Sequence, residues 1–170
     1  MPVIGLSELY NFRVCHGNNF APEKNNLIMT TINLNQLELN EFVAQNNPSQ
    51  RCKATFPMLG AHGTQHSATV YFELEPGDSL GTHTDSAEEL LLILDGTVEV
   101  TIASERTVAT PGTIALVPVM KPHDIRNTGN TKARILGFFG GANNIVATFD
   151  NGWLPGGARV VDTAQATSEG

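Results

Sequence analysis

The clearest pattern in the chain is an alternation of hydrophobic and polar positions. Every second residue is hydrophobic over residues 68–74, and again over 98–102. A period of two is typical of a strand with one buried and one solvated face. Residues 89–94 are different, because after Glu89 the run is almost continuously hydrophobic. That run predicts a strand covered on both faces.

Turn signals separate these segments about every ten residues. Glu75-Pro76-Gly77-Asp78 reads as a turn, and Asp95-Gly96 predicts a tight hairpin. No amphipathic helix interrupts the series, which is typical of a sandwich or barrel of antiparallel strands. The further strands expected are residues 107–109, 113–117, 124–127, 131–139 and 145–149.

The first fifty residues carry a weaker pattern. Residues 27–32 predict a strand, helix-forming residues favour a short helix over 34–44, and 46–49 predict a loop. We therefore expect three parts: an N-terminal extension over residues 1–50 that packs on the barrel or on a partner subunit, the barrel itself over 51–150, and a polar C-terminal tail over 151–170.

Composition narrows the function classes. Ten basic against seventeen acidic residues give a net charge of −7, and no basic stripe marks a nucleic-acid surface. Cys15 and Cys52 lie far apart without a CxxC motif, so neither a disulfide scaffold nor a structural zinc ribbon is indicated. The sequence shows no signal peptide and no membrane-spanning run, and we expect a cytoplasmic protein without a membrane partner.

Four polar residues of the strand-rich region point to metal chemistry. His83 and Asp85 are two residues apart, so they share one face of an extended segment. Glu89 begins the hydrophobic run, and His123 comes from a later strand that can lie beside the first. A buried carboxylate must be paired, protonated or coordinated, whereas an exposed one is simply solvated. Two imidazoles and one or two carboxylates inside a barrel are a common environment for a divalent metal ion.

The spacing of these residues resembles the two sequence motifs of the cupin superfamily. The first motif is matched by Gly77, His83, Asp85, Glu89 and Gly96, although the family usually has a second histidine where Asp85 stands. The second is matched by Gly112, Pro118, His123 and Asn127, with Met120 in place of a glycine. The likeness covers roughly residues 68–139 and implies an all-β, jelly-roll type of barrel.

The resemblance also implies a ligand set. It carries His83, Glu89 and His123 over as ligands of one divalent metal ion, near the wider mouth of the barrel. Asp85 either ligates the ion directly or binds through water and serves as a general base. A site with two carboxylates favours iron or manganese, with zinc or nickel as alternatives.

Other residues near the expected mouth have plain alternatives. Lys121 is a candidate for holding a substrate carboxylate, and His62 and His66 for proton transfer or substrate contact. A solvated lysine and ordinary loop histidines are the simpler interpretations.

Two classes of function fit these expectations. The first is an enzyme that acts on a small organic molecule, by dioxygenase-type or by acid–base chemistry such as an isomerase or lyase reaction, with Asp85 as the catalytic residue. The second is a non-catalytic module that binds or senses a small ligand. We also expect a homodimer, because the outward-facing Leu90, Leu92 and Leu94 need cover.

Overall fold

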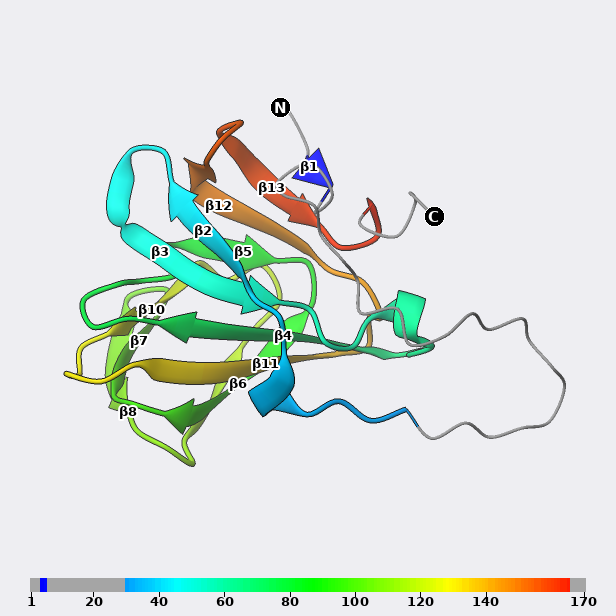
Figure 1. Ribbon diagram of the computed structural model, residues 1–170, viewed down its shortest axis with the longest axis horizontal. Helices are drawn as coiled ribbons and strands as arrows, with labels where there is room; N and C mark the ends of the chain where they lie inside the picture. The colour runs from blue at the N-terminus through cyan, green and yellow to red at the C-terminus, as the bar shows by residue number, and fades with distance from the viewer. Residues whose placement is uncertain (1–3, 6–29, 166–170) are drawn as a thin grey trace, which may run out of the picture.

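The computed structural model describes residues 4–5 and 30–165 and shows one curled β-sheet (Figure 1). Two 3-10 turns, η1 (Leu34–Gln36) and η2 (Gly60–His62), are its short helical pieces. The strands are β1 (Ile4–Gly5), β2 (Asn40–Ala44), β3 (Asn47–Thr55), β4 (Ser67–Leu74), β5 (His83–Asp85), β6 (Glu88–Asp95), β7 (Val98–Ile102), β8 (Glu105–Ala109), β9 (Ile114–Val117), β10 (His123–Asn127), β11 (Ala133–Gly140), β12 (Val146–Trp153) and β13 (Ala158–Asp162).

The sheet folds over into two facing halves. One half has the order β8-β7-β10-β5-β12, with β13 beside β12, and the other has β2-β3-β4-β11-β6-β9. A single register pair, Trp153 with Ala44, joins β12 to β2 between the halves. This jelly-roll arrangement encloses a core of alternate side chains from both halves, as expected for packed antiparallel strands. The all-β cupin-type fold predicted from the sequence is confirmed.

Alternation, the hydrophobic run and the turn signals together located β4 and the strands from β6 to β12. In β6 the side chains of Glu89, Leu91 and Ile93 are buried together on the inner face. The outer face of β6 is not covered, since Leu90 is 38% exposed and Leu92 and Leu94 are half-buried. Within a single chain, no other strand of the described residues covers this face of β6, contrary to the expectation from its continuous hydrophobic run.

The helix predicted over 34–44 is also wrong. Only η1 is helical, and residues 40–44 form β2, which pairs with β3. Phe42 and Ala44 are two residues apart and both buried, so pairing with a neighbouring strand overrides the helix propensity of the segment.

Two further details of the N-terminal region differ from expectation. The turn after β2 falls on residues 45–46, so most of the predicted loop over 46–49 belongs to β3. Of the strand predicted over 27–32, residues 30–32 are not extended into a strand and 27–29 lie outside the described residues, as does Cys15. Strands β2 and β13 place parts of the expected extension and tail within the sheet.

The Asp95-Gly96 hairpin prediction is wrong for a topological reason. Strand β6 pairs with β11 and β9, whereas β7 pairs with β8 and β10, so the chain crosses between the two halves at Gly96. Gly96 has a φ of 81°, and a Cβ added there would lie 2.7 Å from the Cα of Ala133. Glycine is required here because the chain crosses between the two halves with a left-handed backbone close to Ala133, and not because of a two-residue hairpin turn.

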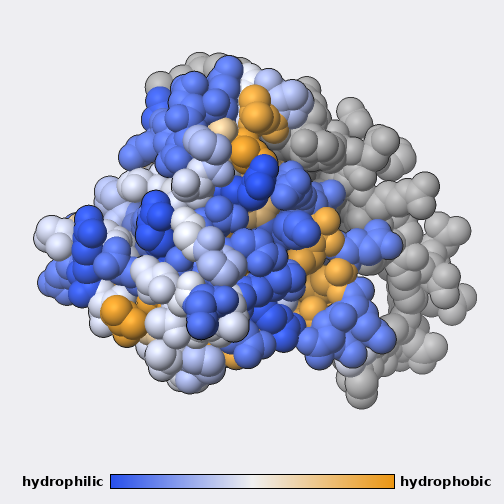
Figure 2. Space-filling view, turned by 60° about the vertical axis from the view of Figure 1, so that its left-hand side comes forward, coloured by the Kyte–Doolittle hydropathy of each residue, from blue (hydrophilic) through white to orange (hydrophobic). Residues whose placement is uncertain are grey.

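The surface of the described residues is mixed. On the face shown in Figure 2, hydrophilic residues dominate and hydrophobic residues gather in a few small patches. Among residues 4–5 and 30–165, no helix has the length and hydrophobicity that a bilayer crossing requires.

Substitution of Gly96 tests the corner. We expect Gly96→Ala to lower the free energy of unfolding by about 2–4 kcal/mol, because a left-handed backbone and a steric clash add together. Gly112→Ala is the matched control: its φ is 88°, but an added Cβ meets no atom within 4 Å. The control should cost only about 1–2 kcal/mol. Equal losses for the two variants in urea unfolding would contradict this account.

Candidate metal centre

Pairing between β5 and β10 brings two histidines together. His83 and His123 are opposite each other in the antiparallel register, and their ring centroids are 4.0 Å apart. Both side chains are almost completely buried. The strand expected to lie beside the first one, on the basis of the sequence, therefore does so.

Backbone carbonyls fix the orientation of both rings. His83 Nδ1 lies 2.8 Å from the carbonyl oxygen of Gly81, and His123 Nδ1 lies 2.9 Å from that of Lys121. A carbonyl oxygen only accepts hydrogen bonds, so each Nδ1–H must donate. The remaining nitrogen of each ring, Nε2, is then available as an acceptor or a metal ligand.

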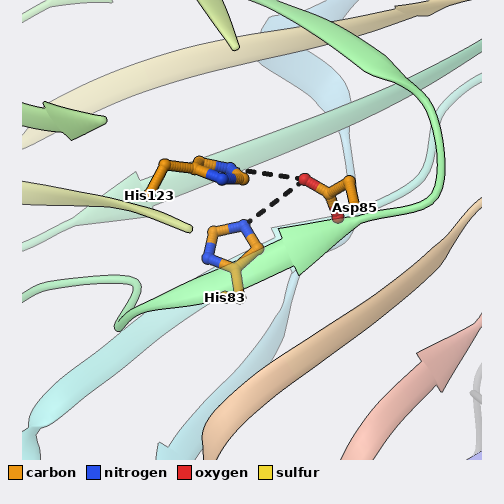
Figure 3. A group of neighbouring side chains, drawn as sticks. All are labelled: His83, Asp85 and His123. Carbon is orange, nitrogen blue, oxygen red and sulfur yellow. Dashed lines mark ion pairs between the residues drawn. The ribbon is translucent and has the colours of Figure 1, made fainter. Parts of the chain in front are cut away.

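Asp85 completes a group of three (Figure 3). Its Oδ2 atom lies 3.6 Å from His83 Nε2 and 3.3 Å from His123 Nε2. One ligand atom from each of the three residues lies within 4.8 Å of the other two, an arrangement that can hold a metal ion. Asp85 reaches this point because it is two residues after His83 on β5 and faces the same way.

The buried polar atoms of this group lack hydrogen-bond partners. Asp85 Oδ2 and His123 Nε2 are both inaccessible to solvent, and beyond their ion-pair contacts with each other, His83 and Glu89 neither has a hydrogen-bond partner. Unpartnered polar atoms in a protein interior are costly and rare. Oxygen and nitrogen acceptors that converge on one point fit a divalent cation, so the residues present suit a metal ion.

Glu89 lies to one side of this trio. Its Oε2 lies 3.4 Å from Nε2 of His123, but its carboxylate does not come within 4.8 Å of the ligand atoms of all three residues. That Glu89 ligates the ion stays a prediction. Its carboxylate lies against Gly137 of β11, where any Cβ would overlap Oε1. The missing side chain at Gly137 thus leaves the space that Glu89 occupies, and the carboxylate faces the cavity.

The titration of the cluster reflects burial and mutual charge. Burial, together with the charge of His123, lowers the pKa of His83 to about 4. Burial would lower the pKa of His123 as well, but the carboxylates of Asp85 and Glu89 outweigh it and raise the pKa to about 10. Burial raises the pKa of Glu89 to about 7. Two buried carboxylates therefore favour a positive charge at this point, which either a proton or a metal ion supplies.

A strained turn holds the histidine and the aspartate in place. Residues 118–121 form a turn in which the Lys121 N–H donates to the Pro118 carbonyl at 3.1 Å, with Met120 at a φ of 59°. The Met120 N–H donates to the carbonyl oxygen of Asp85 at 2.9 Å. A positive φ at the third turn position normally calls for glycine or asparagine. The strained residue, Met120, therefore lies in the turn before His123 and is hydrogen-bonded to β5 through Asp85.

The other residues singled out in the sequence have ordinary surroundings. His62 Nδ1 accepts a hydrogen bond from the Leu59 N–H at 3.0 Å, which is the contact of a local cap. His66 and Lys121 are exposed, and neither lines the cavity. Of Lys121, the group that reaches the cluster is the backbone carbonyl and not the ammonium.

A cavity opens beside the cluster, between the two halves of the sheet. His83, Asp85 and Glu89 form its polar end, and the rest of its lining is hydrophobic. The space that the centres of water-sized molecules can occupy is about 60 Å³, several times the ~10–15 Å³ that one water needs. Trp153, which the sequence did not mark as functional, lines it and is the one tryptophan of the chain.

Comparisons with known proteins agree with the geometry. Residues 70–139 match a family model described as Cupin_2, cupin domain. This segment contains His83, Asp85, Glu89 and His123. A comparison with curated proteins gave no match.

Solved structures show the same fold at low sequence identity. The polyketide cyclase RemF from Streptomyces resistomycificus has 16% identity and a TM-score of 0.55, over 66% of this chain and 80% of that chain. A sugar phosphate isomerase from Silicibacter pomeroyi has 17% identity and a TM-score of 0.57, over 71% and 82%. An oxalate decarboxylase from Lactobacillus farciminis has 20% identity and a TM-score of 0.55, over 64% and 32%. At these identities the likeness establishes the fold alone.

The strained turn leads to a stability prediction. Met120→Gly should raise the free energy of unfolding by about 0.5–1 kcal/mol, since it removes a left-handed strain of ~1–2 kcal/mol and adds a smaller chain-entropy cost. The methionine side chain is 58% exposed, so little burial is lost. Met58→Gly is the control at a methionine without positive φ and should destabilise the protein. Denaturant unfolding of both variants checks the expectation, and a loss of stability in Met120→Gly would show that the turn is unstrained.

Proposed function

Because this chain contains a cupin domain, we propose that it is a metal-dependent enzyme that acts on a small organic molecule. His83, Asp85 and His123 would hold one divalent ion, and the substrate would bind beside it in the cavity. The observation that carries the proposal is the buried convergence of Asp85 Oδ2 and His123 Nε2, which lie 3.3 Å apart with no further hydrogen-bond partner. A cation at their common point satisfies both.

The donor set narrows the identity of the ion. Two imidazole nitrogens and a carboxylate oxygen favour iron or manganese. Zinc and nickel also bind such ligands and are the alternatives. When bound, such an ion acts as a Lewis acid that polarises a substrate oxygen. The backbone carbonyls at Gly81 and Lys121 hold the two rings so that Nε2 faces the ion.

Glu89 is the residue we assign to proton transfer. It lines the cavity beside the trio, with its Oε2 3.4 Å from His123 Nε2. A buried carboxylate next to a metal-bound substrate is well placed to remove or return a proton. We assign the ligand role to Asp85, which the sequence left as either ligand or base, because its Oδ2 lies within 3.6 Å of both imidazoles. The reaction is then of the acid–base type, such as an isomerase or lyase reaction.

A dioxygenase-type reaction is the second candidate. It is favoured by one observation, the two-histidine, one-carboxylate composition of the trio, which is the set used by non-haem iron oxygenases. The compared structures are named for three different reactions, so the fold leaves this choice to the metal. Elemental analysis of protein purified without added metal separates the two: iron supports oxygen chemistry, and manganese or zinc supports acid–base chemistry.

Substitutions in the trio test the metal site. His123→Ala and Asp85→Asn should each weaken Mn²⁺ binding at least 100-fold in calorimetry, because the first removes a ligand and the second the negative charge of one (a loss of about 3 kcal/mol each). Glu89→Gln should change the affinity by less than about tenfold, since a neighbour outside the trio acts only through second-shell effects.

The exposed His66 supplies the matched control. His66→Ala should bind Mn²⁺ like the unmodified protein, which excludes a general effect of histidine removal. Full Mn²⁺ stoichiometry in Asp85→Asn together with its loss in Glu89→Gln would reverse the roles assigned to the two carboxylates. Folding of each variant is monitored by circular dichroism.

We further propose that a second copy of the chain covers the outer apolar face. This face consists of two rows across β11, β6 and the edge strand β9: Phe138, Leu90 and Leu116, and Leu136, Leu92 and Ile114. Ile114 and Leu116 are 62% and 53% exposed, and no row contains a charge. For a chain with a net charge of −7, an uncharged self-complementary face is where two copies meet with the least repulsion.

Sedimentation velocity tests this assembly. We expect a dimer at micromolar concentration, and Leu116→Glu should shift it to monomer because the charge would be buried twice at the interface. Val108→Glu is the control, since Val108 is 64% exposed on β8, outside this face. A monomer in the unmodified chain would refute the proposal.

A further inference from the structure

The lining of the cavity is sharply divided between one polar end and hydrophobic walls. Thirteen of the sixteen lining side chains are apolar, counting Cys52, and the other three are His83, Asp85 and Glu89. All three polar residues lie on β5 and β6, next to the metal centre. A bound molecule therefore meets polar groups at one of its ends only.

An aromatic row leads from the walls to the metal centre. The Phe149 ring stacks on His83 with centroids 4.6 Å apart and an angle of 16°. Trp153 stands edge-on to Phe149 at 5.0 Å, and Phe42 stands edge-on to Trp153 at 6.0 Å. Phe56, Phe72 and Phe139 add further rings to the lining. Rings arranged edge-to-face and stacked favour a planar aromatic guest.

The charge of the cavity lining also restricts the kind of molecule that can bind. No lysine or arginine of residues 30–165 lines the cavity, whereas Asp85 and Glu89 both do. Two carboxylates offset the charge of a divalent ion, so an anionic guest would be buried without a side-chain cation to pair with it. Burial of an unpaired charge is strongly unfavourable.

We propose that the cavity selects a small, uncharged aromatic molecule with one polar oxygen directed at Glu89 and the metal centre. The inference rests on the proposed function, because it places that oxygen beside the ion. The ring would lie along the Phe149–Trp153 row, and the hydroxyl or carbonyl oxygen would face the polar end. The cavity leaves about 60 Å³ for the centres of water-sized molecules, which limits the guest to a single small ring.

The fluorescence of Trp153 provides the readout, since it is the one tryptophan and lies in the lining. Benzyl alcohol, benzoate and oxalate are titrated into the full chain, with and without Mn²⁺. We expect benzyl alcohol to bind at least tenfold more tightly than benzoate in both states, and oxalate to bind weakest. Tighter binding of benzoate or oxalate in either state would overturn the proposal.

A cavity-filling variant locates the binding site. Ala54→Leu places extra volume in the lining away from the trio, so it should weaken benzyl alcohol binding at least tenfold and leave Mn²⁺ affinity unchanged. Val108→Leu, on the exposed strand β8, is the control and should change neither. If Ala54→Leu does not fold, Ala54→Val serves with a smaller expected loss. Unaltered benzyl alcohol binding in a folded filled variant would refute the site.

The two proposals fail in different ways. If the unmodified chain does not bind Mn²⁺, the proposed function is contradicted. The preference for the neutral ring is tested separately, because it is also measured without the ion. A chain that binds Mn²⁺ and prefers the anions keeps its metal centre and loses the proposed substrate class.

Discussion

The site is organised by the convergence of hydrogen-bond acceptors at a buried point. Nε2 of His83, Nε2 of His123 and Oδ2 of Asp85 face one another because both Nδ1–H groups are already engaged by backbone carbonyls. Three acceptors at this range repel one another unless a positive charge lies between them. The raised pKa of His123 shows that a proton can supply this positive charge. A divalent ion would supply more charge and form more ligand bonds.

Few backbone hydrogen bonds between strands hold the two histidines in place. Strands β5 and β10 share one register pair, so the relative position of the two imidazoles depends on additional ties. The Met120 N–H holds the backbone at Asp85, and the Pro122 carbonyl accepts from the Ala103 N–H at 2.8 Å. Ala103 has a φ of 53°, so both ties involve residues with a left-handed backbone that are not glycine. Two strained residues, one before His123 and one in the turn between β7 and β8, therefore contact the segments that carry Asp85 and His123.

Sequence patterns predicted the strands whose burial follows a local period. They did not predict which strands pair, because pairing depends on residues far apart in the chain. Alternation identified β4 and β7, because burial on one face is a local property. It could not show that β6 and β7 lie in different halves, so Asp95-Gly96 read as a hairpin. Motif spacing brought His83 and His123 together. The relative places of Asp85 and Glu89 depend on side-chain reach and on the empty space at Gly137, a residue forty-eight positions after Glu89.

The hydrophobic walls bear directly on the chemistry at the polar end. A low-dielectric lining strengthens every charge interaction among Asp85, Glu89 and a cation placed beside them. Burial raises the pKa of Glu89 to about 7, and a cation nearby would lower that pKa again. The walls that would admit an uncharged ring therefore also influence the charge state of Glu89. In the proposed function, the choice of substrate and the strength of the base would both depend on this one apolar enclosure.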